Sequence, residues 1–140
     1  MLAYPAKIKY DKEDKIYLVS FPDVKGCHTY GKTLEDALKY AREALTGCLE
    51  VAFEENFKIS DPSKLSGKDI YYISPDLNVS FAIQLKKERE NKNLTQKQIA
   101  EKLDISYQAY QKFENPRKAN PTLKTIAKIQ KFLNREIVKI

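Results

Sequence analysis

Long polar side chains that could read DNA bases gather in a short stretch of the C-terminal half. Gln108 and Gln111 can each pair with adenine through two hydrogen bonds, and Lys112 can donate to guanine. The residues that follow suit contacts with backbone phosphates: Asn115, Arg117 and Lys118. An ordinary solvated helix face is also polar, so these residues indicate DNA binding only if the surrounding elements present them together.

Two short helices joined by a tight turn are predicted around these residues. Thr95 and Gln98 have the spacing of a capping box, which starts the first helix. The apolar stripe of that helix consists of Ile99, Ala100 and Leu103. Ser106 is a second N-cap, and Tyr110 and Phe113 share one face of the helix that follows. Two short helices with so short a connection must cross at a steep angle to share a core. This crossing places the second helix at the surface, where it can enter the major groove of DNA.

The charge of the chain is divided unevenly between its halves. The 140 residues include 25 Lys and Arg against 19 Asp and Glu. Residues 81–140 contain 14 basic and 6 acidic residues, whereas residues 1–80 contain 11 and 13. A generally lysine-rich composition would spread basic residues over both halves. We therefore expect a polyanionic partner for the C-terminal half and not for the first.

The N-terminal half shows strand patterns interrupted by one helical pattern. Alternation of apolar and polar residues and a high content of β-branched and aromatic residues predict the strands. Thr33 caps the helix, and Gly26 is free to take a positive φ before the third strand. The predicted elements are strands at residues 4–10, 16–21 and 27–30, a helix from 34 to about 55, and a strand at 70–73. The order β-β-β-α-β predicts an α+β domain with one helix covering the sheet.

The predicted domain boundaries follow from a change of pattern near residue 75. We expect an N-terminal domain at residues 1–74, a linker at 75–80 and an all-α domain at 81–140. Ser80 is predicted to cap the first helix of the second domain, and Pro121-Thr122 to open the last. Glu136–Ile140 is short and β-prone, which fits either a strand at a subunit contact or a frayed tail.

The carboxylates of the first half do not predict a catalytic site. A nuclease centre needs several carboxylates that converge on Mg²⁺. Asp11 and Asp14 are predicted in a turn and Asp23 in a loop, while acidic residues at the start of a helix, such as Glu35 and Asp36, favour its dipole anyway. We therefore interpret these residues as solvated carboxylates rather than metal ligands.

The few histidine and cysteine residues do not predict a metal or cofactor site either. His28 is the only histidine and follows Cys27, but adjacent strand residues point to opposite faces and cannot easily chelate together. We expect a half-buried strand histidine, and reduced, packed thiols at Cys27 and Cys48. No apolar run is long enough to span a membrane, and no signal peptide opens the chain. The chain is thus expected to be a cytoplasmic protein that is not an enzyme.

The C-terminal half resembles the phage-repressor (Xre-like) helix-turn-helix family from Phe81 to about Leu133. The resemblance implies that Gln96 binds phosphate and braces the recognition helix. It places Ser106, Tyr107, Gln108 and Lys112 on groove-facing positions, and Asn115 and Lys118 on the phosphate-contacting loop. The chain departs from the family twice: Asp104 stands where the turn usually has Gly, and Asn115-Pro116 where the loop usually has Asn-Gly. Asp tolerates a left-handed conformation better than most residues.

The N-terminal half resembles the HicB-type antitoxin domain, which has a partial RNase H-like fold. The resemblance covers residues 3 to about 74 and lies in three segments: Ser20–Asp23, Gly26–Gly31 and Thr33–Leu38. It implies a bacterial type II antitoxin that binds a small basic HicA-type toxin, which cleaves RNA, and represses its own operon. Such a repressor would bind operator DNA as a dimer or higher homo-oligomer, because one short helix spans too few bases for specificity.

Toxin contacts are expected in the acidic first half. A toxin that binds RNA must carry a basic surface, which a domain with net negative charge can approach. The candidate contacts are acidic protrusions and nearby aromatic anchors: Asp11, Asp14, Phe21, Asp23 and Tyr30. Two other functions stay open, a repressor whose N-terminal domain senses a small molecule and an RNase H-type nuclease.

Overall fold

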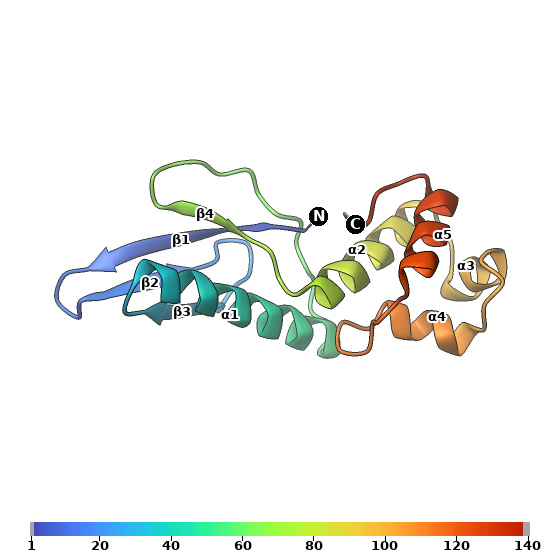
Figure 1. Cartoon of the computed structure of the whole chain (residues 1–140), viewed down its shortest axis with the longest axis horizontal. Helices are drawn as coiled ribbons and strands as arrows, with labels where there is room; N and C mark the ends of the chain where they lie inside the picture. Colours follow the sequence, from blue (N-terminus) through green and yellow to red (C-terminus); the bar gives the residue numbers. More distant parts are fainter. Residues whose placement is uncertain (1, 139–140) are drawn as a thin grey trace. The chain divides into compact units, whose positions relative to one another are not determined.

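The computed structural model describes residues 2–138, which form two compact units (Figure 1). The N-terminal unit comprises Leu2–Asp76, and the C-terminal unit starts at Leu77. Among the described residues, the N-terminal unit contains four strands and one long helix, and the C-terminal unit contains four helices. The α+β class and the order β-β-β-α-β, followed by an all-helical part, are therefore confirmed.

The strands of the N-terminal unit form one antiparallel sheet in the order β3-β2-β1-β4. Their bounds are β1 (Tyr4–Asp11), β2 (Ile16–Ser20), β3 (His28–Gly31) and β4 (Ile70–Ile73). Asp11 was expected in the turn, but it pairs with Ile16 as the last residue of β1, because the antiparallel ladder continues one residue further. Gly26 has a φ of +80°, as expected for the turn before β3.

Helix α1 (Leu34–Glu54) covers one face of this sheet (Figure 1). The Thr33 hydroxyl caps it by accepting a hydrogen bond from the Asp36 amide at 3.0 Å. The helix buries Ala37, Ala41, Leu45 and Leu49 against the inward side chains of the sheet: Tyr4, Ala6, Ile8 and Val19. A Cβ at Gly31 would lie 2.4 Å from the Ala37 amide nitrogen, so the end of β3 can approach the helix only as glycine. Small residues thus set how closely helix and sheet pack.

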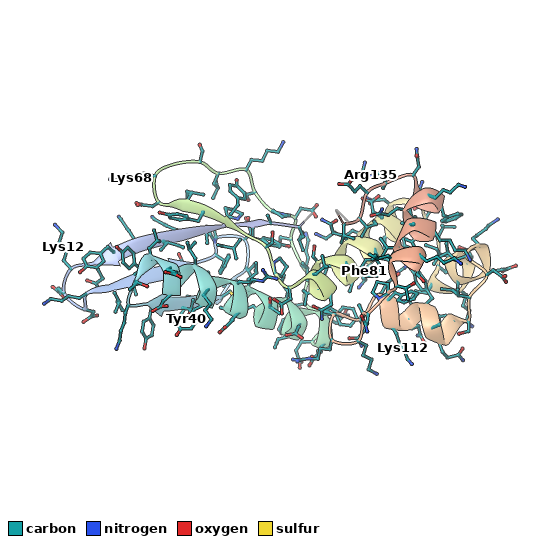
Figure 2. The ribbon with its side chains drawn as sticks, in the orientation of Figure 1. Lys12, Tyr40, Lys68, Phe81, Lys112 and Arg135 are labelled. Atoms are coloured by element: carbon teal, nitrogen blue, oxygen red, sulfur yellow. The ribbon has the colours of Figure 1, made fainter. Side chains whose placement is uncertain are left out.

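The C-terminal unit is a cluster of four helices around one core. They are α2 (Leu77–Asn91), α3 (Gln96–Lys102), α4 (Tyr107–Phe113) and α5 (Leu123–Leu133). The largest core side chains come from all four helices and the segments between them: Phe81, Leu85, Ile99, Leu103, Tyr110, Ile129 and Leu133. Phe81 lies inside this cluster, whereas Lys112 extends outward from α4 (Figure 2).

Helix α2 begins earlier than the sequence predicted. Ser80 was expected to cap it, but the helix starts at Leu77, and Ser80 is 1% exposed within it. Val79 is also buried, and the side-chain amide of Asn78 donates to the Pro116 carbonyl oxygen at 2.8 Å. Tertiary contacts of the first helical turn therefore outweigh the local preference of serine for a cap. Residues 77–80 of the expected linker belong to this helix.

The C-terminal segment folds back on its own unit. Ile137 and Val138 are buried, and their amides donate to the Gln130 side-chain oxygen at 2.8 and 3.0 Å. These two residues of Glu136–Ile140 therefore complete the core and are not a frayed tail, while 139–140 lie outside the described residues. The expected subunit contact of this segment stays a prediction.

Candidate nucleic-acid interface and N-terminal cavity

Helices α3 and α4 start at the caps that the sequence indicated. The Thr95 hydroxyl accepts from the Gln98 amide at 3.1 Å, and the Gln98 side chain accepts from the Thr95 amide at 2.8 Å, which completes the capping box. The Ser106 hydroxyl caps α4 by accepting from the Ala109 amide at 3.1 Å. Asp104 takes the left-handed conformation, with a φ of 56°, in the turn between them. The short connection thus forms with Asp in place of Gly.

The exposed face of α4 carries the base-reading candidates. Gln108, Gln111 and Lys112 are all exposed, and their spacing of three and four residues places them on one side of the helix. Ser106 is exposed at the N-terminal end of the same helix. The structure therefore brings these predicted residues together on a surface that offers donors and acceptors to a ligand.

Tyr107 is held in place by two neighbours. Its hydroxyl accepts a hydrogen bond from the side-chain amide of Gln111 at 3.0 Å, and the Lys97 ammonium lies 5.4 Å from its ring centroid. Tyr107 is half-buried. Sequence reasoning missed Lys97, which adds a cation beside the predicted set. Lys97 lies in α3 and Tyr107 in α4, so the contact depends on how the two helices pack and has no local sequence signal.

The segment after α4 is fixed by hydrogen bonds of its own backbone. Asn115 accepts from the Arg117 amide through its side chain at 3.0 Å and from the Lys118 amide through its carbonyl at 3.0 Å. Pro116 is buried, and its carbonyl accepts from Asn78. Arg117 and Lys118 are exposed. The loop is therefore ordered with Pro in place of Gly, and it displays two cations near the end of α4.

A buried carboxylate that the sequence analysis missed anchors the end of α4. Glu114 is 2% exposed and accepts from Arg89 twice, from Nε at 2.7 Å and from Nη2 at 3.0 Å. Gln96 donates to the same carboxylate at 3.1 Å, and the Tyr110 hydroxyl donates to it as well. The bracing implied for Gln96 is thus a hydrogen bond to the residue that ends α4.

The charges of this cluster shift two pKa values. The hydrogen bond to Glu114 raises the pKa of Arg89, and burial together with Glu114 raises the pKa of Tyr110. An acidic residue at the C-terminal end of a helix opposes the helix dipole, so it needs a cation nearby. That position was the one sequence signal that could have identified Glu114, although it could not have named Arg89 as the partner.

The predicted toxin-contact residues are spread over the N-terminal unit. Asp11 ends β1 and accepts from the Glu13 amide at 3.0 Å, and Asp14 lies in the exposed turn that follows. Asp23 lies beyond the other end of β2 and accepts from the Ser63 amide at 2.7 Å. Phe21 is 4% exposed in the sheet core, so it is not available as an anchor for a partner.

Tyr30 stands on the face of the sheet that α1 does not cover. It is 57% exposed and pairs across strands with Leu18, which pairs with Lys9. Lys7 is also exposed, two residues before Lys9 on the same side of β1. This face therefore combines an aromatic ring with two cations, apart from the acidic turn that ends the β1–β2 hairpin.

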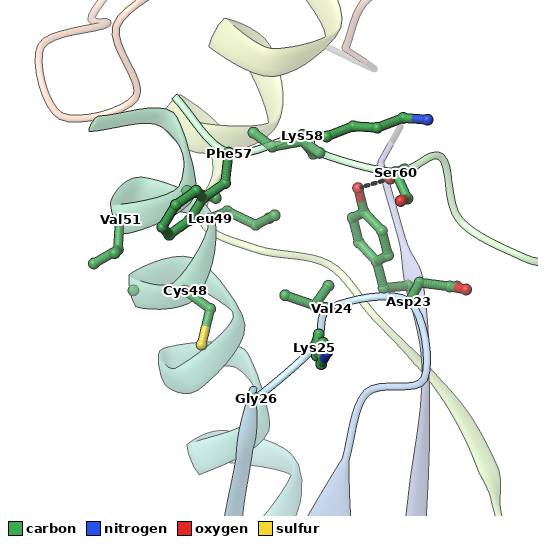
Figure 3. A pocket seen from close by; sticks show the side chains of 14 residues that line it. Asp23, Val24, Lys25, Gly26, Cys48, Leu49, Val51, Phe57, Lys58 and Ser60 are labelled. Atoms are coloured by element: carbon green, nitrogen blue, oxygen red, sulfur yellow. Dashed lines mark hydrogen bonds between the residues drawn. The ribbon is translucent and has the colours of Figure 1, made fainter. Parts of the chain in front are cut away.

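A cavity of about 590 Å³ lies between the C-terminal part of α1 and two loops of the N-terminal unit. Its walls include Gly47, Val51 and Ala52 of α1, Val24 of the loop before β3, and Phe57 of the segment after α1. In Figure 3, Phe57 and Leu49 lie on one side of the cavity, with Val24 across from them. No helix or strand was predicted from sequence between residues 55 and 70, and this site was missed, because it forms only when segments far apart in the sequence meet.

Tyr4, which is fully buried, also lines the cavity. Its hydroxyl donates to the Ser60 carbonyl oxygen at 2.6 Å (Figure 3). Burial, and then the charges of Asp61 and Asp23, raise the pKa of this tyrosine, so it stays a neutral donor. The hydrogen bond ties the segment after α1 to β1 and keeps that wall of the cavity in position.

The cysteine and histidine residues form no metal centre among the described residues. Cys27 is buried and donates to the Ala44 carbonyl oxygen at 3.5 Å, and burial and the neighbouring Cys48 raise its pKa. Both cysteines are free thiols. His28 was expected to be half-buried but is exposed, because α1 covers the opposite face of β3. No helix among residues 2–138 is long and apolar enough to cross a membrane.

Two family models match consecutive parts of the chain. A model described as the HicB-like antitoxin of bacterial toxin-antitoxin systems matches residues 3–86, and a helix-turn-helix model matches residues 85–140. The first match alone covers more than half of the chain, so it identifies the family of the N-terminal unit and the start of α2. The second identifies the four-helix cluster that carries α3 and α4.

Curated relatives have the same family name. Antitoxin HicB 1 of Photorhabdus laumondii is 33% identical over 107 residues, which are 76% of this chain and 66% of that protein. Antitoxin HicB of Escherichia coli K12 is 31% identical over 87 residues, 62% of each chain. The chain thus matches somewhat less than two thirds of the length of these relatives.

A solved structure was also found, the N-terminal domain of the Burkholderia pseudomallei antitoxin HicB. It is 27% identical, with a TM-score of 0.46, and the match covers 54% of this chain and 100% of that one. The family matches, with the geometry of α3 and α4, lead to one conclusion: this chain belongs to the HicB-like antitoxin family and carries a C-terminal helix-turn-helix DNA-binding domain.

Proposed function

We propose that the chain neutralises a HicA-type, RNA-cleaving toxin and represses its own operon by binding operator DNA. The observation that carries this proposal is the union of an antitoxin domain with a helix-turn-helix whose second helix exposes Gln108, Gln111 and Lys112. A protein with both parts can couple toxin capture to transcription. Both activities belong in the cytoplasm, where operator DNA and messenger RNA are found.

In the DNA-binding part, α4 enters the major groove. Its exposed face reads base edges, with Ser106 and Tyr107 at the helix start. Gln96, Asn115, Arg117 and Lys118 contact backbone phosphates and set the orientation. Because α4 has only seven residues, a homodimer or higher oligomer reads two half-sites about 34–36 Å apart, or a multiple of that spacing.

In the antitoxin part, the N-terminal unit binds the toxin. It contains 11 basic and 13 acidic residues, whereas the C-terminal part is strongly basic and repels another basic protein. Of the contacts expected from sequence, Asp11, Asp14, Asp23 and Tyr30 are exposed or partly exposed and stay candidates. Phe21 is withdrawn from this set because it is part of the core.

The test joins a growth assay with DNA-binding measurements. A HicA-type toxin is expressed with and without residues 1–76, and growth and co-purification are measured. Restored growth with a stable complex is the expected result, and a toxin captured only by residues 77–140 would refute the assignment. In parallel, the full chain should shift DNA from upstream of its own gene at lower concentration than unrelated DNA of the same length.

A ligand-responsive repressor is the second candidate function, favoured by the cavity beside α1. Its volume of about 590 Å³ is in the range of small-molecule pockets. In that case a metabolite, rather than a protein, would change operator affinity. Operator binding that responds to cell-extract metabolites in the absence of any toxin would support this candidate over the first.

A further inference from the structure

The cavity of the N-terminal unit opens beside exposed apolar side chains. Phe57 is 64% exposed and Val51 is 47% exposed, and both line the cavity. Large apolar groups rarely stay in water next to a hollow surface unless another molecule covers them. In protein interfaces, the side chains that contribute most to affinity fill such pockets and exclude water around them.

The segments that form the cavity hold the negative charge of the unit. Residues 23–26 and 47–61 contain five carboxylates and two lysines, and the rest of residues 1–76 contains eight acidic and nine basic residues. The five carboxylates are Asp23, Glu50, Glu54, Glu55 and Asp61. In Figure 3, the ammonium of Lys58 points away from α1. The lining itself carries Asp23, Lys25 and Lys58, and the other four carboxylates lie within two positions of a lining residue in the sequence. These segments are therefore acidic as a whole, although the unit is nearly neutral.

The end of α1 adds to this negative potential. The last turn of the helix contains no basic residue, although cations are favoured at a helix C-terminus. Glu54 and Glu55 are exposed there, where they oppose the helix dipole. Because both side chains are exposed, a cationic partner can reach their carboxylates from solution.

We propose that the cavity beside α1 receives an apolar side chain of the basic toxin, and that the carboxylates around it receive the cations that flank this side chain. The inference rests on the proposed function and locates its toxin contact. It moves the centre of that contact away from the acidic hairpin turn and retains only Asp23 from the set expected from sequence. The open face of the sheet is the less suitable surface, because Lys7 and Lys9 repel a basic partner.

Gly47 allows the cavity to be blocked without disturbing the fold. It lies within α1, lines the cavity, and a Cβ at this position meets nothing within 4 Å. Gly47→Leu should therefore fill the space while improving helix propensity, and Gly47→Ala is the matched control, which improves propensity and leaves most of the space open. The ligand is a HicA-type toxin that is inactivated by changing its catalytic histidine to alanine.

The full-length chain is titrated with this inactive toxin, and the dissociation constant is measured for each variant. Gly47→Leu should weaken binding at least about 30-fold, as blocking a hot-spot pocket does, whereas Gly47→Ala should bind like the unchanged chain. Wild-type affinity for Gly47→Leu, with an unchanged melting temperature, would overturn the proposal and leave the antitoxin function intact. Absence of binding by the unchanged chain would instead overturn the proposed function itself.

Two further variants keep the test decisive if Gly47→Leu does not fold. Phe57→Ala removes an exposed side chain, so the fold should persist while affinity falls about tenfold. Glu54→Lys should slow association at low salt, whereas Glu43→Lys, the same charge change at an exposed position of α1 outside the acidic segment 47–61, should slow it much less. Equal effects of the two charge reversals, with unchanged affinity of Phe57→Ala, would overturn the proposal.

Discussion

Carboxylates are used in opposite ways by the two units. In the C-terminal unit, Glu114 is buried and receives hydrogen bonds from Arg89, Gln96 and Tyr110. In the N-terminal unit, Glu54 and Glu55 are exposed at the end of a helix whose last turn has no basic residue. A carboxylate that is buried within the fold positions a rigid surface, whereas an exposed carboxylate can be reached by another molecule.

The same contrast applies to the surfaces themselves. Gln108, Gln111 and Lys112, the proposed DNA contacts, project from one short helix whose end is anchored by a buried cluster, so their spacing is preset. The cavity of the N-terminal unit is made from α1, the loop before β3 and the segment after α1, and it is defined by its shape and the charge around it. Four experiments test this comparison, and they follow in order of decreasing expected effect.

Loss of the buried carboxylate should have the largest effect. Glu114→Ala leaves the Arg89 guanidinium, which is 12% exposed, without its ion-pair partner. Breaking a buried pair in this way costs about 3–5 kcal/mol, so the free energy of unfolding of the C-terminal unit should fall by that amount. Urea denaturation followed by circular dichroism measures the change. Glu54→Ala, at an exposed position, should change it by less than about 0.5 kcal/mol, and similar losses for both variants would remove the contrast between buried and exposed carboxylates.

Substitution on the exposed face of α4 should affect binding without affecting stability. Gln108→Ala should weaken operator binding by about 1–3 kcal/mol and relax base preference, because it removes a contact to base edges. Lys118→Ala should weaken binding to all sequences alike and make the salt dependence shallower. Gel-shift titrations on operator and mutated operator separate the two effects. An unchanged affinity and preference for Gln108→Ala would show that α4 is not the reading helix.

Alkaline pH should weaken both units through their buried tyrosines. The pKa values of Tyr4 and Tyr110 are raised mainly by burial, so the folded chain keeps these protons where the unfolded chain, with a tyrosine pKa of about 10, releases them. Their contribution to stability is complete below about pH 10 and is lost as the pH rises above it. Urea denaturation on both sides of that pH should show a smaller decline for Tyr110→Phe than for the unchanged chain. The exposed Tyr40 supplies the control, since Tyr40→Phe should leave the decline as it is.

The smallest expected effect is a gain in stability at the cavity. Gly47→Ala should raise the free energy of unfolding of the N-terminal unit by up to about 1 kcal/mol, because alanine favours the helix and its methyl group meets open space. Gly31→Ala is the opposite case, since its Cβ would lie 2.4 Å from the Ala37 amide nitrogen. Thermal unfolding should show a higher melting temperature for Gly47→Ala and a lower one for Gly31→Ala. A loss of stability for Gly47→Ala would mean that the cavity wall does not have the space on which the blocking experiment depends.

Features that depend on neighbouring residues were determined by the sequence alone. The caps at Thr33, Thr95 and Ser106 lie where the residue types placed them, because a cap needs only a side chain and an amide two or three residues away. The left-handed turn at Asp104 follows from the same local chemistry. The order of strands and helices along the chain, β-β-β-α-β followed by helices, could be predicted because hydrophobic periodicity records which face of each element is buried.

Features that join distant residues were decided only by the tertiary structure. Arg89 and Glu114 are 25 positions apart, and nothing in their local sequence pairs them until α2 and α4 pack together. The early start of α2 reflects the burial of Val79 and Ser80, which outweighs the capping preference of serine. The cavity forms where three segments meet without filling the space between them, and its volume depends on side-chain packing, which hydrophobic patterning does not specify.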